Sequence, residues 1–412
     1  MIRHRRIRPA FWGVLILLGA AASTTAAPPP GGLFTSPPTD LGNIAGIVPL
    51  GSLSPGSGHI LPVDHMYIAY PNPFNGGADS YPVYAMAGGE VVLIGRTWRD
   101  DLSSFDYELY IQHTATITSQ FDHLHDLSAA LLSHLDSIPD AWIELSDTTD
   151  IMFLGQFGAP APFPVSAGEQ VGITRSFFFS WDVGVIDLSV HRSFAGHGPR
   201  RYPTLRQFAR LLGLEIRQAP YPGDRTLNAG CFLDYLTPAL RAVWFAQLLS
   251  TPQDCGRPDW DLPNRLRGSW FNVAVDEVAE PPLFELELAA LSIVPDNFRP
   301  LTHVQIGAGS GHPLAGLDPD DLYPQLDNRF LVTVDPTPGA RINPDPAQVS
   351  AQTGLVCYDM EYAGGALYNT LLVKMTGPRD VLLKYDPTDY AAPHCPVAIL
   401  TEPDAWTAHY VR

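Results

Sequence analysis

Hydrophobic and polar residues alternate with the two-residue period of β-strands over most of the chain from residue 58 onwards. In the first part, strand-like runs lie at 83–86, 91–94 and 107–111, with Gly-Gly and polar turns between them. A second series occupies 270–275, 283–293, 303–306, 329–334, 356–362, 367–375 and 381–385. Turn residues separate these runs at short intervals. The pattern predicts a mostly β protein whose residues 266–412 form a C-terminal antiparallel sandwich or barrel.

Three stretches have the 3.6-residue period of helices instead. The first covers 127–136, with Asp126 as the expected N-cap. The second, 204–213, ends on a glycine, and the third, 237–249, begins with Thr237 as N-cap and Pro238 at the first helical position. The last two lie within 193–265, which we interpret as a short helical connector between two β domains.

The N-terminus has the three parts of a signal peptide, which we assign to residues 1–27. A basic segment at 3–8 precedes an apolar segment at 10–20, and the small residues 25–27 suit cleavage. The apolar segment is too short to span a bilayer, and no later apolar run is long enough. We therefore predict a secreted or periplasmic protein of bacterial-type export. Residues 28–57, rich in Pro, Gly and Ser, form a lead-in that is either an extended tether or a strand edge.

Composition narrows the possible partners. The 412 residues are 45% hydrophobic and 17% charged, which excludes a disordered chain. The formal net charge of −18 would repel phosphate backbones and anionic lipid, so nucleic acid and acidic membrane surfaces are poor partners.

Four cysteines, Cys231, Cys255, Cys357 and Cys395, are an even number in an exported chain, which indicates disulfides. Four cysteines allow three pairings. Loop-closure entropy favours partners that are close in sequence, so we predict Cys231–Cys255 and Cys357–Cys395. The first bridge would tie the helical connector. Zinc binding by the cysteines is disfavoured because they form no closely spaced pair.

Histidines and acidic residues recur in a definite order between residues 58 and 192. His59 is followed by Asp64, a strand ends at His113, and Phe121-Asp-His123-Leu124 comes next. The turn 165–172 reads Val-x-x-Gly-x-x-Val-Gly. This order resembles the lysostaphin-type zinc metallopeptidases, which cleave peptide cross-links of bacterial cell walls on a duplicated-hybrid-motif β fold. The resemblance implies such a domain at 58–192, with His59 and Asp64 as zinc ligands.

Two departures from the family pattern concern the metal. Five positions rather than four separate His59 from Asp64, and the final strand, 181–187, lacks the family's His-x-His pair. Residues i and i+2 of a strand share one face, so Asp182 and Gly184 stand at the two histidine positions. Glycine cannot bind zinc, and a catalytic zinc needs three protein ligands and an open position for water. We therefore predict weak or absent zinc binding.

Three functions follow from these residues. The first is a catalytically degenerate relative that binds peptidoglycan peptide, glycan or a cell-envelope protein. The second is an active zinc endopeptidase, in which Asp182, His113 or His123 completes the ligands and the remaining histidine, His113 or His123, orients water or stabilises the oxyanion. The third is a structural adhesion protein. His65, His125, His134, His191 and His197 are interpreted as surface or loop residues.

Overall fold

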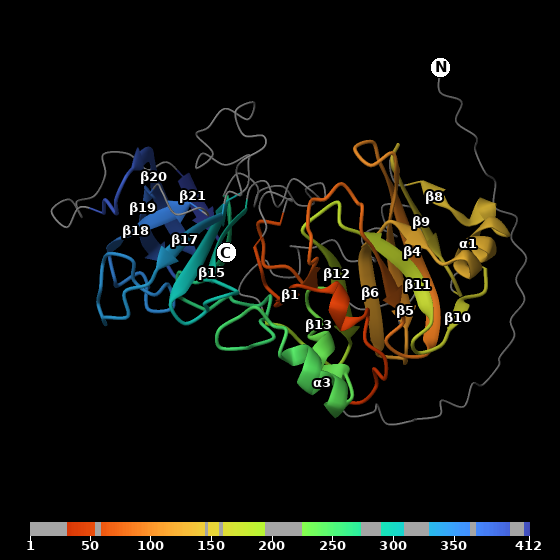
Figure 1. Cartoon of the computed structure of the whole chain (residues 1–412). Coiled ribbons are helices and arrows are strands. Elements are labelled where there is room, and N and C mark those ends of the chain that lie inside the picture. Colours follow the sequence, from red (N-terminus) through yellow and green to blue (C-terminus); the bar gives the residue numbers. More distant parts are fainter. Residues whose placement is uncertain are drawn as a thin grey trace, which may run out of the picture.

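The computed structural model describes residues 31–53, 59–144, 147–155, 160–193, 225–272, 290–308, 329–362, 368–395 and 408–412. The predicted signal peptide and the predicted helix at 204–213 lie outside them. The described part is mostly β. One region carries a large antiparallel sheet and the other a closed barrel, and Figure 1 shows them side by side.

Ten strands form the large sheet, in an order that places strands from distant parts of the sequence next to each other. β10 pairs with β4 and β13 pairs with β12, beside a path of eight strands. In path order, these eight strands are β1 (Gly46–Val48), β2 (Met66–Ala69), β12 (Ser180–Asp187), β6 (Ile117–Leu124), β5 (Ser104–Gln112), β4 (Gly89–Arg99), β9 (Thr149–Phe153) and β8 (Ile143–Glu144). The two additional strands are β10 (Phe163–Val165) and β13 (Ala229–Gly230).

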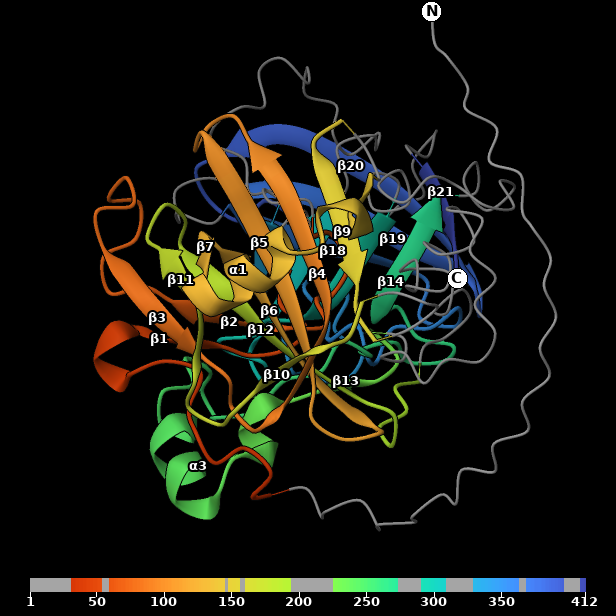
Figure 2. The same cartoon turned by 90° about the vertical axis from the view of Figure 1, so that its right-hand side faces the viewer.

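A smaller sheet and the helix α1 (Ala129–Asp136) lie beside the large sheet (Figure 2). The smaller sheet contains β3 (Ser80–Tyr84), β11 (Gln170–Arg175) and β7 (Asp126–Leu127). One hydrophobic core includes side chains from both sheets and α1. Ser128 caps α1 by accepting a hydrogen bond from Leu131 N. The predicted cap, Asp126, is wrong, because this residue belongs to β7.

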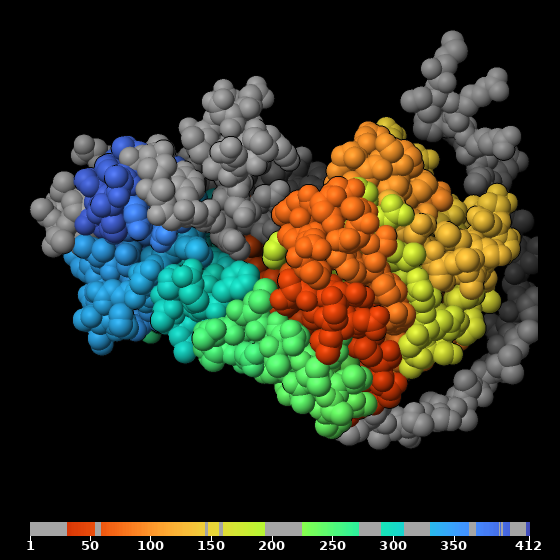
Figure 3. All heavy atoms as spheres, viewed as in Figure 1, coloured from red at the N-terminus to blue at the C-terminus, as the bar shows by residue number. Residues whose placement is uncertain are grey.

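Residues 231–255 pack into this same core rather than standing apart. Phe232, Leu233 and Trp244 are buried with the strands of the large sheet. The helix α3 (Pro238–Phe245) has the predicted Thr237 cap, which accepts from Leu240 N. The described 3-10 helices of the large-sheet region are η1 (Leu41–Asn43), η3 (Pro139–Ala141) and η5 (Phe232–Tyr235). In Figure 3 the green surface of residues 225–272 adjoins the red N-terminal segment.

The lead-in does not remain an extended tether over its described part. β1 is the first strand on the sheet's path and pairs with β2 over Gly46–Val48. Phe34 is fully buried in the core. The strand-edge alternative therefore describes this segment.

The C-terminal region is a closed antiparallel barrel of eight strands joined in sequence order. Its buried residues form a second core that includes the fully buried Trp270. The guanidinium of Arg412 lies 3.9 Å from the centre of the Trp270 ring. The strands are β14 (Gly268–Asn272), β15 (Ala290–Pro295), β16 (His303–Ala308), β17 (Arg329–Thr333), β18 (Leu355–Tyr362), β19 (Tyr368–Gly377), β20 (Asp380–Tyr390) and β21 (Ala408–Val411).

Polar and apolar contacts join the two regions. Leu53 N donates to Gln305 Oε1 at 3.3 Å, and Asn297 Nδ2 donates to Leu50 O at 3.0 Å. Ile60 packs with Phe271 in a small apolar cluster.

Both predicted disulfides are present. Cys231–Cys255 and Cys357–Cys395 each have a Cα–Cα separation of 5.9 Å, and there is no free cysteine. These bridges suit an extracellular or otherwise oxidising environment. None of the helices in the described ranges has the length and apolar character needed to cross a membrane.

Candidate functional site

A patch of polar side chains lies on one face of the large sheet, at its centre. Asp182 pairs with Asp122, and Gly184 pairs with Gln120, across β12 and β6. Gln120 in turn pairs with Tyr110 on β5. Residues paired across antiparallel strands share a face, so these positions form one surface. The opposite face of β12 carries Trp181, Val183 and Val185 into the main core.

Five side chains form a chain of alternating carboxylates and imidazoles across this patch. His65 Nδ1 lies 3.0 Å from Asp64 Oδ1, and its Nε2 lies 3.2 Å from Asp182 Oδ2. His123 Nε2 lies 3.7 Å from the same Asp182 oxygen, and its Nδ1 lies 2.9 Å from Asp106 Oδ2. Asp182 Oδ1 is buried and has no hydrogen-bond partner within the described ranges.

The backbone of His123 accounts for its position. Simple alternation along β6 would turn residue 123 to the face opposite Asp122. A register shift between β5 and β6 and a positive φ of 62° at His123 break the alternation. A non-glycine residue in this conformation is uncommon and costs energy, so the surrounding contacts must hold it. Thr174 Oγ1 donates to His123 O at 3.0 Å and fixes the strand end.

Arg225 bridges two carboxylates of the patch. Its Nη2 lies 3.3 Å from Asp64 Oδ1, and its Nη1 lies 2.9 Å from Glu108 Oε1. Glu108 Oε1 also accepts hydrogen bonds from Tyr110 OH at 2.7 Å and from Gln120 Nε2 at 2.6 Å. Thr226 Oγ1 donates to Asp64 Oδ2 at 3.0 Å. The Asp64 carboxylate is therefore enclosed by donors.

Burial and neighbouring charges shift the pKa values of Asp64, His65 and Glu108. Burial acts to raise the pKa of Asp64, but the neighbouring Arg225, together with His65, holds it well below its usual range. Burial also opposes the charge on His65, yet Asp182 and Asp64 raise its pKa above the ordinary value. Burial and the Asp122 charge raise the pKa of Glu108 to about 7.

The pKa values of His123 and His59 shift in opposite directions. Burial would lower the pKa of His123, but Asp122, Asp182 and Asp106 raise it well above the ordinary value. Burial and the His65 charge lower the pKa of His59 to about 3. At neutral pH the patch thus contains cationic His123 and neutral His59.

Four of the five residues predicted from the lysostaphin resemblance, His59, Asp64, His123 and Asp182, come together here. The His59 and His65 ring centres lie 5.6 Å apart, which places His59 beside the chain of charged groups. His113 does not join them. Its ring contacts Gly88 O at 3.1 Å and Ser119 Oγ at 2.8 Å, and packs against Phe34 in the main core. Strand alternation on β5 explains this correction, because Glu108 and Tyr110 face the patch and residue 113 has the opposite parity.

Sequence reasoning missed four charged members of the patch. His65 was interpreted as a surface or loop residue, but it is 3% exposed and central. Its place directly after Asp64 was a usable signal. A second signal was the alternation along β5, in which the acidic residues Asp106 and Glu108 share one face of the strand. Arg225 gave no signal, because its contacts are more than 100 residues away in the sequence.

The patch does not reproduce the metal site that the resemblance implies. In the described part of the chain, two sets of three His, Cys, Asp or Glu residues bring their donor atoms within 4.8 Å of one another. One is Asp106, Asp122 and His123, and the other contains Cys231 and Cys255, which are already joined. Neither includes His59, Asp64 or Asp182.

The position expected for a third ligand is also filled. A Cβ on Gly184 would lie 2.9 Å from Gln120 Oε1, so an imidazole there requires Gln120 to move. The residues present therefore do not fit the zinc centre of the lysostaphin-type enzymes.

No known protein-family model and no curated protein matches this chain. The lysostaphin resemblance thus depends on the motif order alone.

Proposed function

We propose that this chain is an exported binding protein, related in its first domain to the lysostaphin-type peptidases, that has exchanged hydrolysis for recognition of cell-wall peptide. The alternative partners of the same surface are cell-wall glycan and cell-envelope proteins. Under this proposal, the chain does not hydrolyse peptide bonds.

The contact of Arg225 with Asp64 carries the proposal. In a lysostaphin-type site, this aspartate would give its negative charge to zinc. Here the guanidinium, 3.3 Å away, already neutralises that charge. A guanidinium stays protonated at any physiological pH and has no open coordination position, so it cannot lower the pKa of a water as zinc does.

The other substitutions point the same way. Gly184 offers no ligand atom, and Gln120 takes up the space beside it while donating to Glu108 at 2.6 Å. Asp182, at the other family histidine position, is held between His65 and His123. Asp64 and Asp182, which would lie at ligand positions in the family, are instead engaged in ion pairs.

Three measurements on the purified mature protein test the proposal. Metal analysis after dialysis in zinc-containing buffer should find less than stoichiometric zinc. A turbidity assay on cross-linked cell walls should show no lysis. In a sedimentation assay, the protein should pellet with purified walls, whereas an unrelated acidic protein of similar size should stay in solution.

Two results would count against it. Stoichiometric zinc together with lysis that His59→Ala abolishes would identify an active endopeptidase. Absence of the protein from the wall pellet would favour the structural adhesion alternative.

A further inference from the structure

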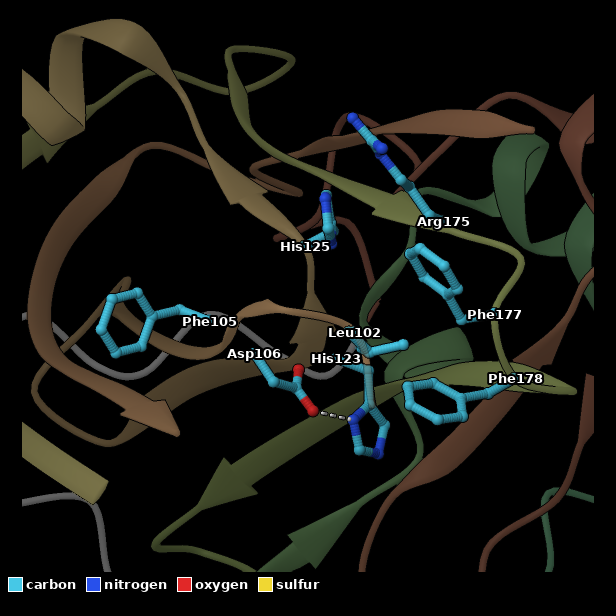
Figure 4. Close-up of a pocket in the computed structure, with 8 residues that line it drawn as sticks. All are labelled: Leu102, Phe105, Asp106, His123, His125, Arg175, Phe177 and Phe178. Carbon is cyan, nitrogen blue, oxygen red and sulfur yellow. Dashed lines mark hydrogen bonds and ion pairs between the residues drawn. The ribbon is translucent and has the colours of Figure 1, made fainter. Parts of the chain in front are cut away.

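A small hollow opens beside His123, at the edge of the polar patch. Its lining comes from the start of β5, the end of β6, the end of β11 and the turn that follows β11. Six of the lining residues matter for what it can bind: Phe105, Asp106, His123, Arg175, Phe177 and Phe178. Figure 4 shows Arg175 at one end of the hollow and the Asp106–His123 pair at the other.

Arg175 is the notable charge in this hollow. Its half-buried side chain has no ion pair or hydrogen bond in the part of the chain that the structure describes, and its Nε is buried. Arg96 and Arg99, on the neighbouring hairpin, each contact an aspartate at 2.8 and 2.9 Å respectively. A sheltered cation without a partner is costly, and an anionic ligand would offset that cost.

The walls of the hollow are aromatic. Phe177 and Phe178 lie along one side and Phe105 lies opposite (Figure 4). The Phe178 ring centre is 5.4 Å from that of His123. Aromatic walls exclude water, which strengthens a charge contact made between them, and they offer apolar surface to a side chain of the ligand.

Asp106 does not oppose an anion here, because His123 contacts it at 2.9 Å and balances its charge. Arg99 Nη1 also lies 3.8 Å from the same Asp106 oxygen. The end of the hollow that contains Arg175 is therefore available to negative charge.

We propose that this hollow binds the free C-terminal carboxylate of a peptide, with the Arg175 guanidinium holding the carboxylate and Phe177 and Phe178 contacting the terminal side chain. Arginine recognises carboxylates through two parallel N–H donors, which gives both affinity and orientation. The inference rests on the proposed function and names its ligand class, a peptide with a free carboxyl end.

Calorimetric titration with acetyl-alanyl-alanine and with its C-terminal amide tests this directly. The two probes differ only in the terminal charge. We expect the free acid to bind at least about tenfold more tightly than the amide, the factor for one charge-assisted contact of about 1.4 kcal/mol. Acetate should bind more weakly than the peptide, because it lacks the apolar part.

Arg175→Gln should remove at least about tenfold of the affinity for the free acid and leave the amide unaffected. Arg241→Gln is the matched control, since Arg241 is exposed on α3 and paired with Asp234 at 3.1 Å. Unchanged thermal midpoints would show that both variants are folded. Equal binding of acid and amide, no binding of the acid at millimolar concentration, or full affinity in Arg175→Gln would each overturn the proposal.

Wall sedimentation separates this inference from the proposed function. If Arg175→Gln pellets with walls as the parent does, the carboxylate site is wrong and wall binding stands. If the parent binds the free acid but does not pellet with walls, the carboxylate site stands and the cell-wall function is wrong.

Discussion

Gly184 and Gln120 face each other across β12 and β6, and a Cβ on Gly184 would lie 2.9 Å from Gln120 Oε1. Gln120 in turn donates to Glu108, which contacts Arg225. Gly184 thus lies against a hydrogen-bonded and ion-paired network that includes Gln120, Glu108 and Arg225.

The first prediction concerns the creation of a zinc site at residue 184. We expect Gly184→His alone to bind no more zinc than the parent, because Gln120 blocks the imidazole and Arg225 occupies Asp64. The triple variant Gly184→His, Gln120→Ala, Arg225→Gln should bind zinc at least about tenfold more tightly than the single variant. Competition with a chromophoric chelator measures both affinities. Stoichiometric, tight zinc in Gly184→His alone would show that Gln120 is no obstacle.

The second prediction concerns the ion pairs of Arg225. Arg225→Met removes the partner of Asp64 and Glu108, and we expect it to lower the free energy of unfolding by about 2 kcal/mol. The loss is below that of a fully buried pair because the Arg225 side chain is 30% exposed. Urea denaturation measures it. The control, Arg241→Met, breaks an exposed pair and should cost less than about 1 kcal/mol. Equal losses in the two variants would contradict a structural role for Arg225.

The third prediction concerns acid stability and His113. Burial lowers the pKa of His113 to about 4, so below pH 6.5 the unfolded chain takes up a proton that the folded chain does not. Stability should therefore fall between pH 6.5 and 4, with His113 accounting for about 2 kcal/mol, since its half-buried ring keeps some contact with water. Urea denaturation of His113→Gln at several pH values should show a shallower decline. The control variant His191→Gln, at an exposed position, should lose stability with falling pH as the parent does. If His113→Gln loses stability as steeply as the parent, His113 does not cause the loss.

The fourth prediction concerns the bridge Cys231–Cys255, which spans 24 residues and ties α3 into the main core. Replacing both cysteines by alanine frees this segment in the unfolded chain and should cost about 3 kcal/mol. The thermal midpoint of the double variant, measured without reductant, should fall accordingly. A parent protein treated with reductant provides the comparison. No change in midpoint would mean that packing of Phe232 and Trp244 alone fixes the segment.

Much of the fold was predictable from local patterns. The seven strand segments expected in the C-terminal region all contain strands of the barrel within the described residues, because alternation of buried and exposed residues is a local property. The eighth, β21, is short and was missed, and it closes the barrel by pairing with both β14 and β20. Sequence therefore left open the choice between sandwich and barrel, which depends on that pairing.

The candidate site was less predictable. Parity along a strand was enough to place Asp182 and Gly184 on one face. The motif order led us to expect His59, Asp64 and His123 close together, and in the structure all three lie in or beside the patch. The same parity, applied to His113, would have placed it away from the patch. His123 reaches the patch only through a positive φ and a register shift, which no local pattern indicates.

The sequence by itself determined the β-strands, both disulfide pairings and the absence of a third imidazole at residue 184. These follow from periodicity, loop-closure entropy and residue identity, all of which are local or nearly so. Only the tertiary structure decided which group neutralises Asp64. Arg225 reaches Asp64 and Glu108 from 161 and 117 residues away, because the pairing of β13 with β12 and the packing of residues 231–255 against the large sheet bring its guanidinium to those carboxylates. A charge pair over such a distance depends on the completed fold.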